Sequence, residues 1–280
     1  MPRANRSFLP GHIWHITHRC HKKEFLLKFR KDKLLWLHWA LQAKLRYGLV
    51  ILNFMITSNH IHLLAMCRAL RGRMPPHLVI SRALQLVESR VALGFNSRKD
   101  RHGAFWEDRY HATAVESGPQ LARCLTYIDM NMVRARVVSH PRDWPYCGYS
   151  ELAREIAESP TRLRRRSLLV DGGALTALMG VPDPAAVYVQ RSQWIDAAIR
   201  KGHLERDPVW TESLAVGSDD FLRSFAAELG NRIGAAEIVC GDVSKDVTAL
   251  KRARGNPIIV FGPKNDDLRP FRCANHGLNR

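Results

Sequence analysis

Residues 49–66 constrain the fold most, because they have the pattern of a β-hairpin. Residues 49–57 are rich in aliphatic and β-branched side chains, Ser58 and Asn59 follow as turn-forming residues, and residues 60–66 are again mostly apolar. Such side chains favour strands, and a two-residue loop between two strands is typical of a tight hairpin. The chain is therefore expected to build an antiparallel sheet around this hairpin.

The segments before and after the hairpin complete an α+β pattern. In chain order, the expected elements are a strand at 12–19, a helix at 31–47, the hairpin, a helix at 78–94, an extended piece at 104–115 and a helix from about 118 to 137. Leucines at helical spacing among lysines mark the first of these helices. This order, with two helices over one sheet, predicts a ferredoxin-like or RRM-like antiparallel sheet with helices on one face.

The composition shifts beyond residue 150, where a mainly helical C-terminal extension is expected. The helical stretches lie near 168–180, 184–201 and 218–231, and short β-like runs follow at 237–239 and 257–261. We therefore expect a first domain at 8–150, a helical extension at 151–232 and a poorly defined tail at 233–280.

The balance of charge favours a polyanionic partner. The chain has 43 Lys and Arg against 26 Asp and Glu, a net charge of +17. Solubility of a small domain needs a net charge of only about 2–8. Nucleic acid is the first candidate partner and an anionic membrane surface the second. The alternative is a basic protein whose positive surface is only solvated and binds no polyanion.

The absence of several sequence motifs limits the cellular location that we expect for the chain. The six cysteines form no C-x-x-C pair, which argues against a zinc ribbon. No run approaches 18 apolar residues, and the first residues lack the apolar core of a signal peptide. We expect a reduced, cytoplasmic, nucleoid-associated chain with no membrane contact.

His60 and His62 form an H-x-H pair on the second strand of the hairpin. Strand side chains alternate, so both imidazoles project from one face, about 6.6 Å apart along the backbone. Two imidazoles supply half the coordination sphere of a divalent transition metal. The chain has 13 histidines, however, so an H-x-H pair of ordinary hydrogen-bonded residues is the competing interpretation.

Tyr127 and Asn131 lie four residues apart on the last predicted helix of the first domain, and therefore on one face. Arg123 and Arg134 lie near the same line, beside the apolar stripe. A phenol has a pKa of about 10 and is a poor nucleophile near neutral pH, so it needs a phosphodiester polarised by cations. A structural tyrosine at the edge of the core is the alternative.

Five segments link these two features to a known family. They are residues 10–19 (PGHIWHITHR), 56–64 (ITSNHIHLL), 105–110 (FWEDRY), 127–135 (YIDMNMVRA) and 140–145 (HPRDWP). In this order and spacing the chain resembles the bacterial single-tyrosine HUH transposases, most of all the REP-associated tyrosine transposases of the IS200-like family. The resemblance covers residues 8–150 well, continues more loosely to about 230, and leaves 231–280 unmatched.

The resemblance implies a role for each matched position. His60 and His62 correspond to the metal-binding histidines, Tyr127 to the nucleophile, and Asn131 to a further metal ligand, with Mg²⁺ or Mn²⁺ as the cofactor. The family usually has Asn-Pro-Val where this chain has Met132 after Asn131. Because proline clashes with the preceding helical turn, its absence is expected to leave this helix straighter.

The implied activity is cleavage and rejoining of single-stranded DNA through a 5′-phosphotyrosine, at hairpin sequences of the REP type. Transesterification needs no ATP, and the chain has no G-x-x-x-x-G-K motif. A single tyrosine per chain is compatible with action in cis or across a homodimer. The expected DNA-binding residues are Arg71, Arg73, Arg109, Arg123, Arg134, Arg164 and Arg165.

Alternatives remain at the level of the sequence. Tyr110 is a rival nucleophile, and the histidines of the first strand, with His15 on the face opposite to His12 and His18, are expected to serve the sheet face or DNA rather than a second metal. A non-catalytic domesticated hairpin-binding protein, an RRM-like RNA-binding module and a replication-initiation or conjugative nickase are the rival functions.

Overall fold

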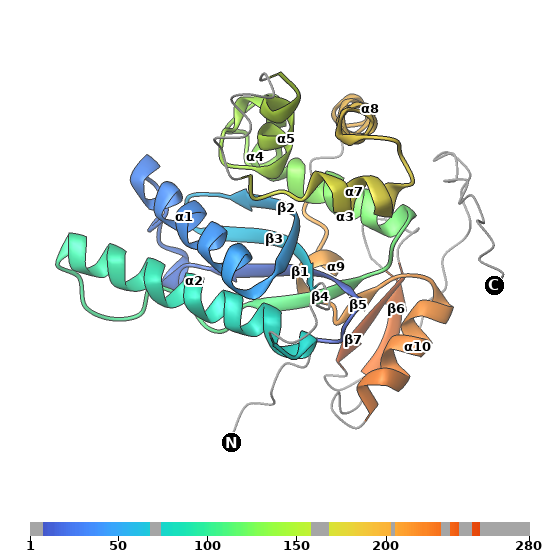
Figure 1. The fold of residues 1–280 in the computed structure, drawn as a ribbon, viewed down its shortest axis with the longest axis horizontal. Helices are drawn as coiled ribbons and strands as arrows, with labels where there is room; N and C mark the ends of the chain where they lie inside the picture. The colour runs from blue at the N-terminus through green and yellow to red at the C-terminus, as the bar shows by residue number, and fades with distance from the viewer. Residues whose placement is uncertain are drawn as a thin grey trace.

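Seven strands form one sheet in the part of the chain that the computed structural model describes, which is residues 8–67, 74–157, 168–202, 205–230, 236–240 and 248–252 (Figure 1). The strand order is β2-β3-β1-β4-β5-β7-β6. The strands are β1 (Ile13–Arg19), β2 (Leu49–Ile56), β3 (His60–Cys67), β4 (His111–Val115), β5 (Ala215–Val216), β6 (Ala236–Cys240) and β7 (Thr248–Arg252).

The first four strands form the expected antiparallel unit. β2 and β3 are the predicted hairpin, in which Ile56 pairs with Ile61 across the turn at Ser58 and Asn59. β1 pairs with β3 on one side and with β4 on the other, both antiparallel. The order β2-β3-β1-β4 confirms the α+β class with a ferredoxin-like sheet.

Helices cover both faces of this sheet. The helices α1 (Arg30–Tyr47) and α2 (Pro76–Lys99) lie together on one face, as predicted, and Trp36 of α1 contacts Phe54 of β2 with ring centroids 6.2 Å apart. The helix α3 (Pro119–Asp129) lies on the opposite face (Figure 1). On that face the Tyr127 ring packs 6.0 Å from the His62 ring. Alternation along the strands separates the apolar core under α1 and α2 from the histidine face under α3.

The part of the chain after residue 140 closes the β2 edge of the sheet. The backbone N–H of Ile56 donates to Tyr146 O, and that of Asp171 donates to Ile51 O. An exposed strand edge is a site for unwanted pairing, and covering it removes that site. The helices that follow are α5 (Gly148–Ala157), α7 (Gly172–Met179), α8 (Pro184–Arg200), α9 (Val209–Glu212) and α10 (Asp219–Leu229).

The extension also adds strands to the opposite end of the sheet. β5 pairs with β4 in parallel, and β7 joins β5 to β6 by antiparallel pairing. The expected helices are present, but the extension contains β5, β6 and β7 as well, and β6 includes the predicted run at 237–239. The second predicted run, 257–261, lies outside the described residues. None of the described helices is long and apolar enough to span a membrane.

Candidate functional site

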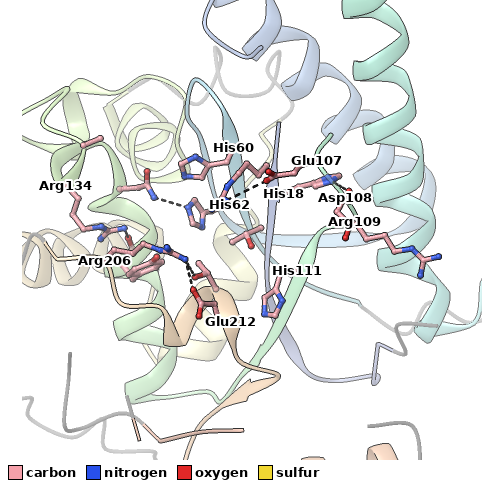
Figure 2. Close-up of a pocket in the computed structure, with 16 residues that line it drawn as sticks. His18, His60, His62, Glu107, Asp108, Arg109, His111, Arg134, Arg206 and Glu212 are labelled. Carbon is pink, nitrogen blue, oxygen red and sulfur yellow. Dashed lines mark hydrogen bonds and ion pairs between the residues drawn. The ribbon is translucent and has the colours of Figure 1, made fainter. Parts of the chain in front are cut away.

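A cavity of about 810 Å³ opens where β1 ends, β3 begins and α3 ends (Figure 2). It combines residues of the sheet, of α3 and of the segment around α9. Its lining residues are Thr17, His18, Arg19, His60, His62, Glu107, Asp108, Arg109, His111, Tyr127, Asn131, Arg134, Ala135, Arg206, Thr211 and Glu212.

His60 is held by the hairpin turn that precedes it. Its Nδ1 lies 2.7 Å from Asn59 Oδ1 and 3.0 Å from Thr57 Oγ1. Because the amide oxygen can only accept, Nδ1 carries the proton and Nε2 presents a lone pair. Burial, with Arg19, Arg134 and Arg206 nearby, lowers the pKa of His60 to about 4, so the imidazole is neutral near pH 7.

His62 lies between two hydrogen-bond partners. Its Nδ1 is 2.9 Å from His15 Nε2, and its Nε2 is 2.9 Å from Asn131 Nδ2. Burial lowers the pKa of His62 well below 6.5, and the pKa of His15 falls to about 3 for the same main reason. The His60 and His62 rings are 5.0 Å apart, so two neutral imidazoles border the cavity together.

Tyr127 is buried at the end of α3, with 9% of its surface exposed. Its ring centroid lies 6.0 Å from the His62 ring, and the Arg134 guanidinium lies over the ring at 4.2 Å. Burial raises the pKa of Tyr127, while Arg134 and Arg206 act in the opposite direction. The phenol is therefore protonated near neutral pH, and the guanidinium is placed to stabilise a developing phenolate.

Asn131 reaches His62 because the helix breaks. α3 ends at Asp129, and a separate turn, α4 (Asn131–Arg134), follows Met130. In a continuous helix the Tyr127 carbonyl would accept from the Asn131 N–H, but here Arg134 Nη2 donates to it at 2.7 Å. The expectation of a straighter helix is wrong, because a side chain inserted at this carbonyl interrupts the helix without a proline.

Residues 11–131 match the family model described as "Transposase IS200 like". Over these residues the chain is similar to the IS200-like transposases. His60, His62, Tyr127 and Asn131 all lie inside the matched segment.

Two solved structures resemble the chain at low identity. One is described as "Structure of the REP associates tyrosine transposase bound to a REP hairpin": identity is 17%, the match covers 61% of this chain and 94% of the other, and the TM-score is 0.44. The second is a putative transposase from Deinococcus radiodurans R1, with 13% identity, 41% and 86% coverage, and a TM-score of 0.29. The comparison with curated proteins gave no match.

The seven arginines predicted to bind DNA differ in their positions relative to the cavity. Arg134 and Arg109 line the cavity, although Arg109 is exposed and extends away from the histidines in Figure 2. Arg123 is half-buried on α3 and is not among the lining residues. The other four predicted DNA contacts, Arg71, Arg73, Arg164 and Arg165, lie outside the described residues.

The rival tyrosine lies away from this cavity. Tyr110 packs against Phe8, with ring centroids 6.1 Å apart, and against His18 at 6.2 Å. Its neighbours Arg109 and His111 line the cavity, but Tyr110 does not. The geometry brings Tyr127, rather than Tyr110, to the histidine pair.

The extension contributes residues that the sequence interpretation missed. Arg206 lines the cavity and forms an ion pair with Glu212 at 3.0 Å, and the Trp210 ring lies 6.0 Å from the Tyr127 ring. His15, expected only to serve the sheet face or DNA, contacts His62 directly. Strand alternation separates His15 from His12 and His18, but only the pairing of β1 with β3 puts His15 on the face of His62. No motif marked Arg206 or Trp210.

The donor atoms of the cavity fit a divalent metal. Among the described residues, no group of three or more His, Cys, Asp or Glu side chains is arranged to hold one. The available donors are instead two neutral imidazoles and the Asn131 amide, which suit transition metals better than Mg²⁺. The Nε2 lone pair of His62 that accepts from Asn131 is also the one that a metal would use.

Proposed function

We propose that the chain is a metal-dependent DNA transposase that cleaves and rejoins single-stranded DNA through a covalent bond to Tyr127. One observation carries the proposal: the only tyrosine lining the described cavity contacts both the Arg134 guanidinium and the His62 ring. The family of residues 11–131 supports the same reaction class. His60, His62 and Asn131 are the proposed holders of Mg²⁺ or Mn²⁺.

The proposed reaction exchanges one phosphodiester for another. The Tyr127 hydroxyl oxygen attacks a backbone phosphorus, the bond from phosphorus to the 3′ oxygen breaks, and the departing strand end leaves as a 3′-OH after gaining a proton. The phenol loses its own proton in the same exchange. Attack of a new 3′-OH on the phosphotyrosine reverses these bond changes and frees the tyrosine. The number of phosphoester bonds stays constant, so no nucleotide cofactor is required.

The protein groups around the phosphate have distinct parts in this proposal. Arg134 stabilises negative charge on the Tyr127 oxygen, which offsets the rise in pKa caused by burial. A bound metal would polarise a non-bridging phosphate oxygen. Arg19 and Arg206 line the same cavity and would hold the DNA backbone, with an affinity that falls steeply with salt.

The proposed substrate is single-stranded DNA that carries a hairpin of the REP type. The net charge of +17 supports a polyanionic partner. The sequence resemblance to REP-associated transposases is the reason for proposing that this partner is a DNA hairpin. Action as a homodimer stays a prediction.

A covalent-capture experiment tests the proposal. The protein is incubated with end-labelled hairpin oligonucleotides and Mn²⁺, denatured, and run on a gel that separates protein–DNA adducts from free DNA. We expect an adduct with the unaltered protein and with Tyr110→Phe, the matched control, and none with Tyr127→Phe. DNA binding without an adduct from the unaltered protein would instead support the non-catalytic hairpin-binding function. If Tyr110→Phe loses the adduct and Tyr127→Phe keeps it, Tyr110 is the nucleophile instead of Tyr127.

A further inference from the structure

We infer that His15 is a positioning residue that fixes the tautomer of His62, and that the backbone carbonyl of Trp210 anchors this arrangement. The inference rests on the proposed function in one respect, which is that His62 is a metal ligand. It adds a residue of the first strand and a carbonyl of the extension to the machinery of the site.

A chain of three hydrogen bonds carries the inference. His15 Nδ1 lies 2.8 Å from Trp210 O, His15 Nε2 lies 2.9 Å from His62 Nδ1, and His62 Nε2 lies 2.9 Å from Asn131 Nδ2. A carbonyl oxygen only accepts, so His15 Nδ1 carries a proton. The Nε2 of a neutral His15 is then an acceptor, and the proton of the middle bond belongs to His62 Nδ1.

The far end of the chain assigns the same tautomer. The amide nitrogen of Asn131 only donates, so His62 Nε2 must be the acceptor in the third bond. The two ends agree, although one is a carbonyl on α9 and the other a side chain on α4. His62 is therefore held with its proton on Nδ1 and its lone pair on Nε2, facing the cavity.

The packing around His15 keeps this relay in place. His15 is 0% exposed, and its ring is nearly parallel to that of His62, at an interplanar angle of 9°. Trp210 is 3% exposed, and Thr113 Oγ1 donates to the same carbonyl at 3.4 Å. Burial on all sides leaves little freedom for either ring to turn over.

The tautomer decides whether His62 can bind a metal. With the proton on Nδ1, the Nε2 lone pair can coordinate a metal once the Asn131 N–H turns away from it; with the opposite tautomer, an N–H would face the metal. Groups that orient a metal-binding histidine in this way typically change metal affinity 10- to 100-fold when mutated. Removing His15 is expected to weaken Mn²⁺ binding by about that factor.

Trp210 lies outside the segment that matches the transposase family, residues 11–131. The extension thus acts on the metal site through a backbone atom, which no substitution of the Trp210 side chain removes. This explains why a segment with no recognisable motif completes the site.

Two measurements test the inference without relying on DNA cleavage. Long-range ¹H–¹⁵N NMR of histidine-labelled, metal-free protein near pH 7 reports the tautomer of His62, and electron paramagnetic resonance of free Mn²⁺ gives the affinity. In the unaltered protein we expect the Nδ1–H tautomer. His15→Phe should yield the Nε2–H form or a mixture and bind Mn²⁺ about 10- to 100-fold more weakly.

Matched variants separate positioning from packing. His15→Gln keeps an amide N–H for Trp210 O and an oxygen for His62 Nδ1, and should retain the tautomer and most of the affinity. The exposed His38 gives the control His38→Phe, which should change neither. An Nε2–H tautomer in the unaltered protein, or a folded His15→Phe with unchanged tautomer and affinity, would overturn the inference. If His15→Phe does not fold, the unaltered protein and His15→Gln decide.

The same experiments distinguish failure of the proposed function. Tyr127→Phe should lose the DNA adduct but keep the His62 tautomer and the Mn²⁺ affinity. If no hairpin gives an adduct while the His15 variants behave as expected, the nuclease proposal fails and the positioning role stands. If the adduct forms but the His62 tautomer does not depend on His15, the nuclease proposal stands and the positioning role of His15 fails.

Discussion

A buried ion pair fixes the tyrosine helix to the extension, and removing its cation should destabilise the protein strongly. Arg191 of α8 binds both carboxylate oxygens of Asp129, with Nη2 at 2.9 and 2.8 Å, and Asn53 donates to the same carboxylate at 2.9 Å. Both charged side chains are 1% exposed. Asp129 is two residues from Tyr127 and two from Asn131, so this pair holds the end of α3 that carries the candidate site.

The expected magnitude follows from the desolvation of the carboxylate that remains. Arg191→Met fills most of the side-chain volume but leaves Asp129 buried, with the hydrogen bond from Asn53 as its remaining side-chain hydrogen bond among the described residues. Breaking a buried pair in this way costs about 3–5 kcal/mol of unfolding free energy. Replacing both members, in Arg191→Met with Asp129→Leu, removes the uncompensated charge and should recover much of that loss.

The penalty should also depend on pH. Burial already raises the pKa of Asp129 above its usual value, and Arg191 opposes that rise. Without Arg191 the folded state binds a proton at a pH where the unfolded chain does not. Its stability therefore increases as the pH falls towards the ordinary pKa of an aspartate, so the penalty is larger at pH 8 than at pH 5.

Urea unfolding followed by tryptophan fluorescence measures all three proteins at both pH values. The reasoning is refuted if folded Arg191→Met loses less than about 1 kcal/mol of unfolding free energy, because a buried carboxylate without its cation should destabilise the fold by more than that. It is also refuted if the double variant is no more stable than Arg191→Met. A linear dependence on urea with an unchanged slope is required for the comparison.

Three further predictions concern the site and its surroundings. Arg134→Met should lower adduct formation by about 100-fold in a single-turnover cleavage assay, while filter binding of the hairpin changes little, since its guanidinium lies over the Tyr127 ring; equal losses in both assays would contradict this role. The pKa of His60 is lowered to about 4, so Mn²⁺ affinity should stay nearly constant from pH 8 to about 5 and fall as the pH approaches 4, whereas an affinity lost near pH 6.5 would show an ordinary imidazole. Gly148→Ala should destabilise the fold by about 1–3 kcal/mol in urea unfolding, because its Cβ would collide with the Asn53 side-chain oxygen and lie 3.1 Å from the backbone nitrogen of Phe54; an unchanged midpoint would show that these contacts relax freely.

Local periodicity was sufficient to predict the elements of the first domain and several of the residues that line the cavity, among them His60, His62, Tyr127 and Asn131. Alternation along one strand places His60 and His62 together, and this relation is fixed within a single element. The four-residue spacing predicts that Tyr127 and Asn131 lie near each other, although the structure divides them between α3 and α4. Both relations are local in the sequence, so they need no knowledge of how distant elements pack. The α+β order follows for the same reason, since each of its helices and strands has its own hydrophobic period.

The residues that were missed depend on contacts between distant elements. His15 reaches His62 only because β1 pairs with β3 so that Thr17 lies opposite His62, and a shift by one residue would turn His15 to the other face. Arg206 lines the cavity and Trp210 packs near Tyr127, and both precede β5, a strand of two residues that pairs in parallel with β4. A strand of that length has too few residues to show alternation, so its sequence carries no usable signal.

The break after α3 shows that a residue other than proline can interrupt a helix. Proline, where the family has it, breaks a helix by removing an N–H and clashing with the preceding turn. Here Met132 does neither, yet Arg134 donates to the Tyr127 carbonyl from four residues beyond the turn at Met130, and the helix ends at Asp129. The same guanidinium covers the Tyr127 ring, so the residue that bends the chain towards His62 also sets the charge around the phenol. A substitution at position 134 should therefore change geometry and electrostatics together, which is why the cleavage and binding assays have to be read as a pair.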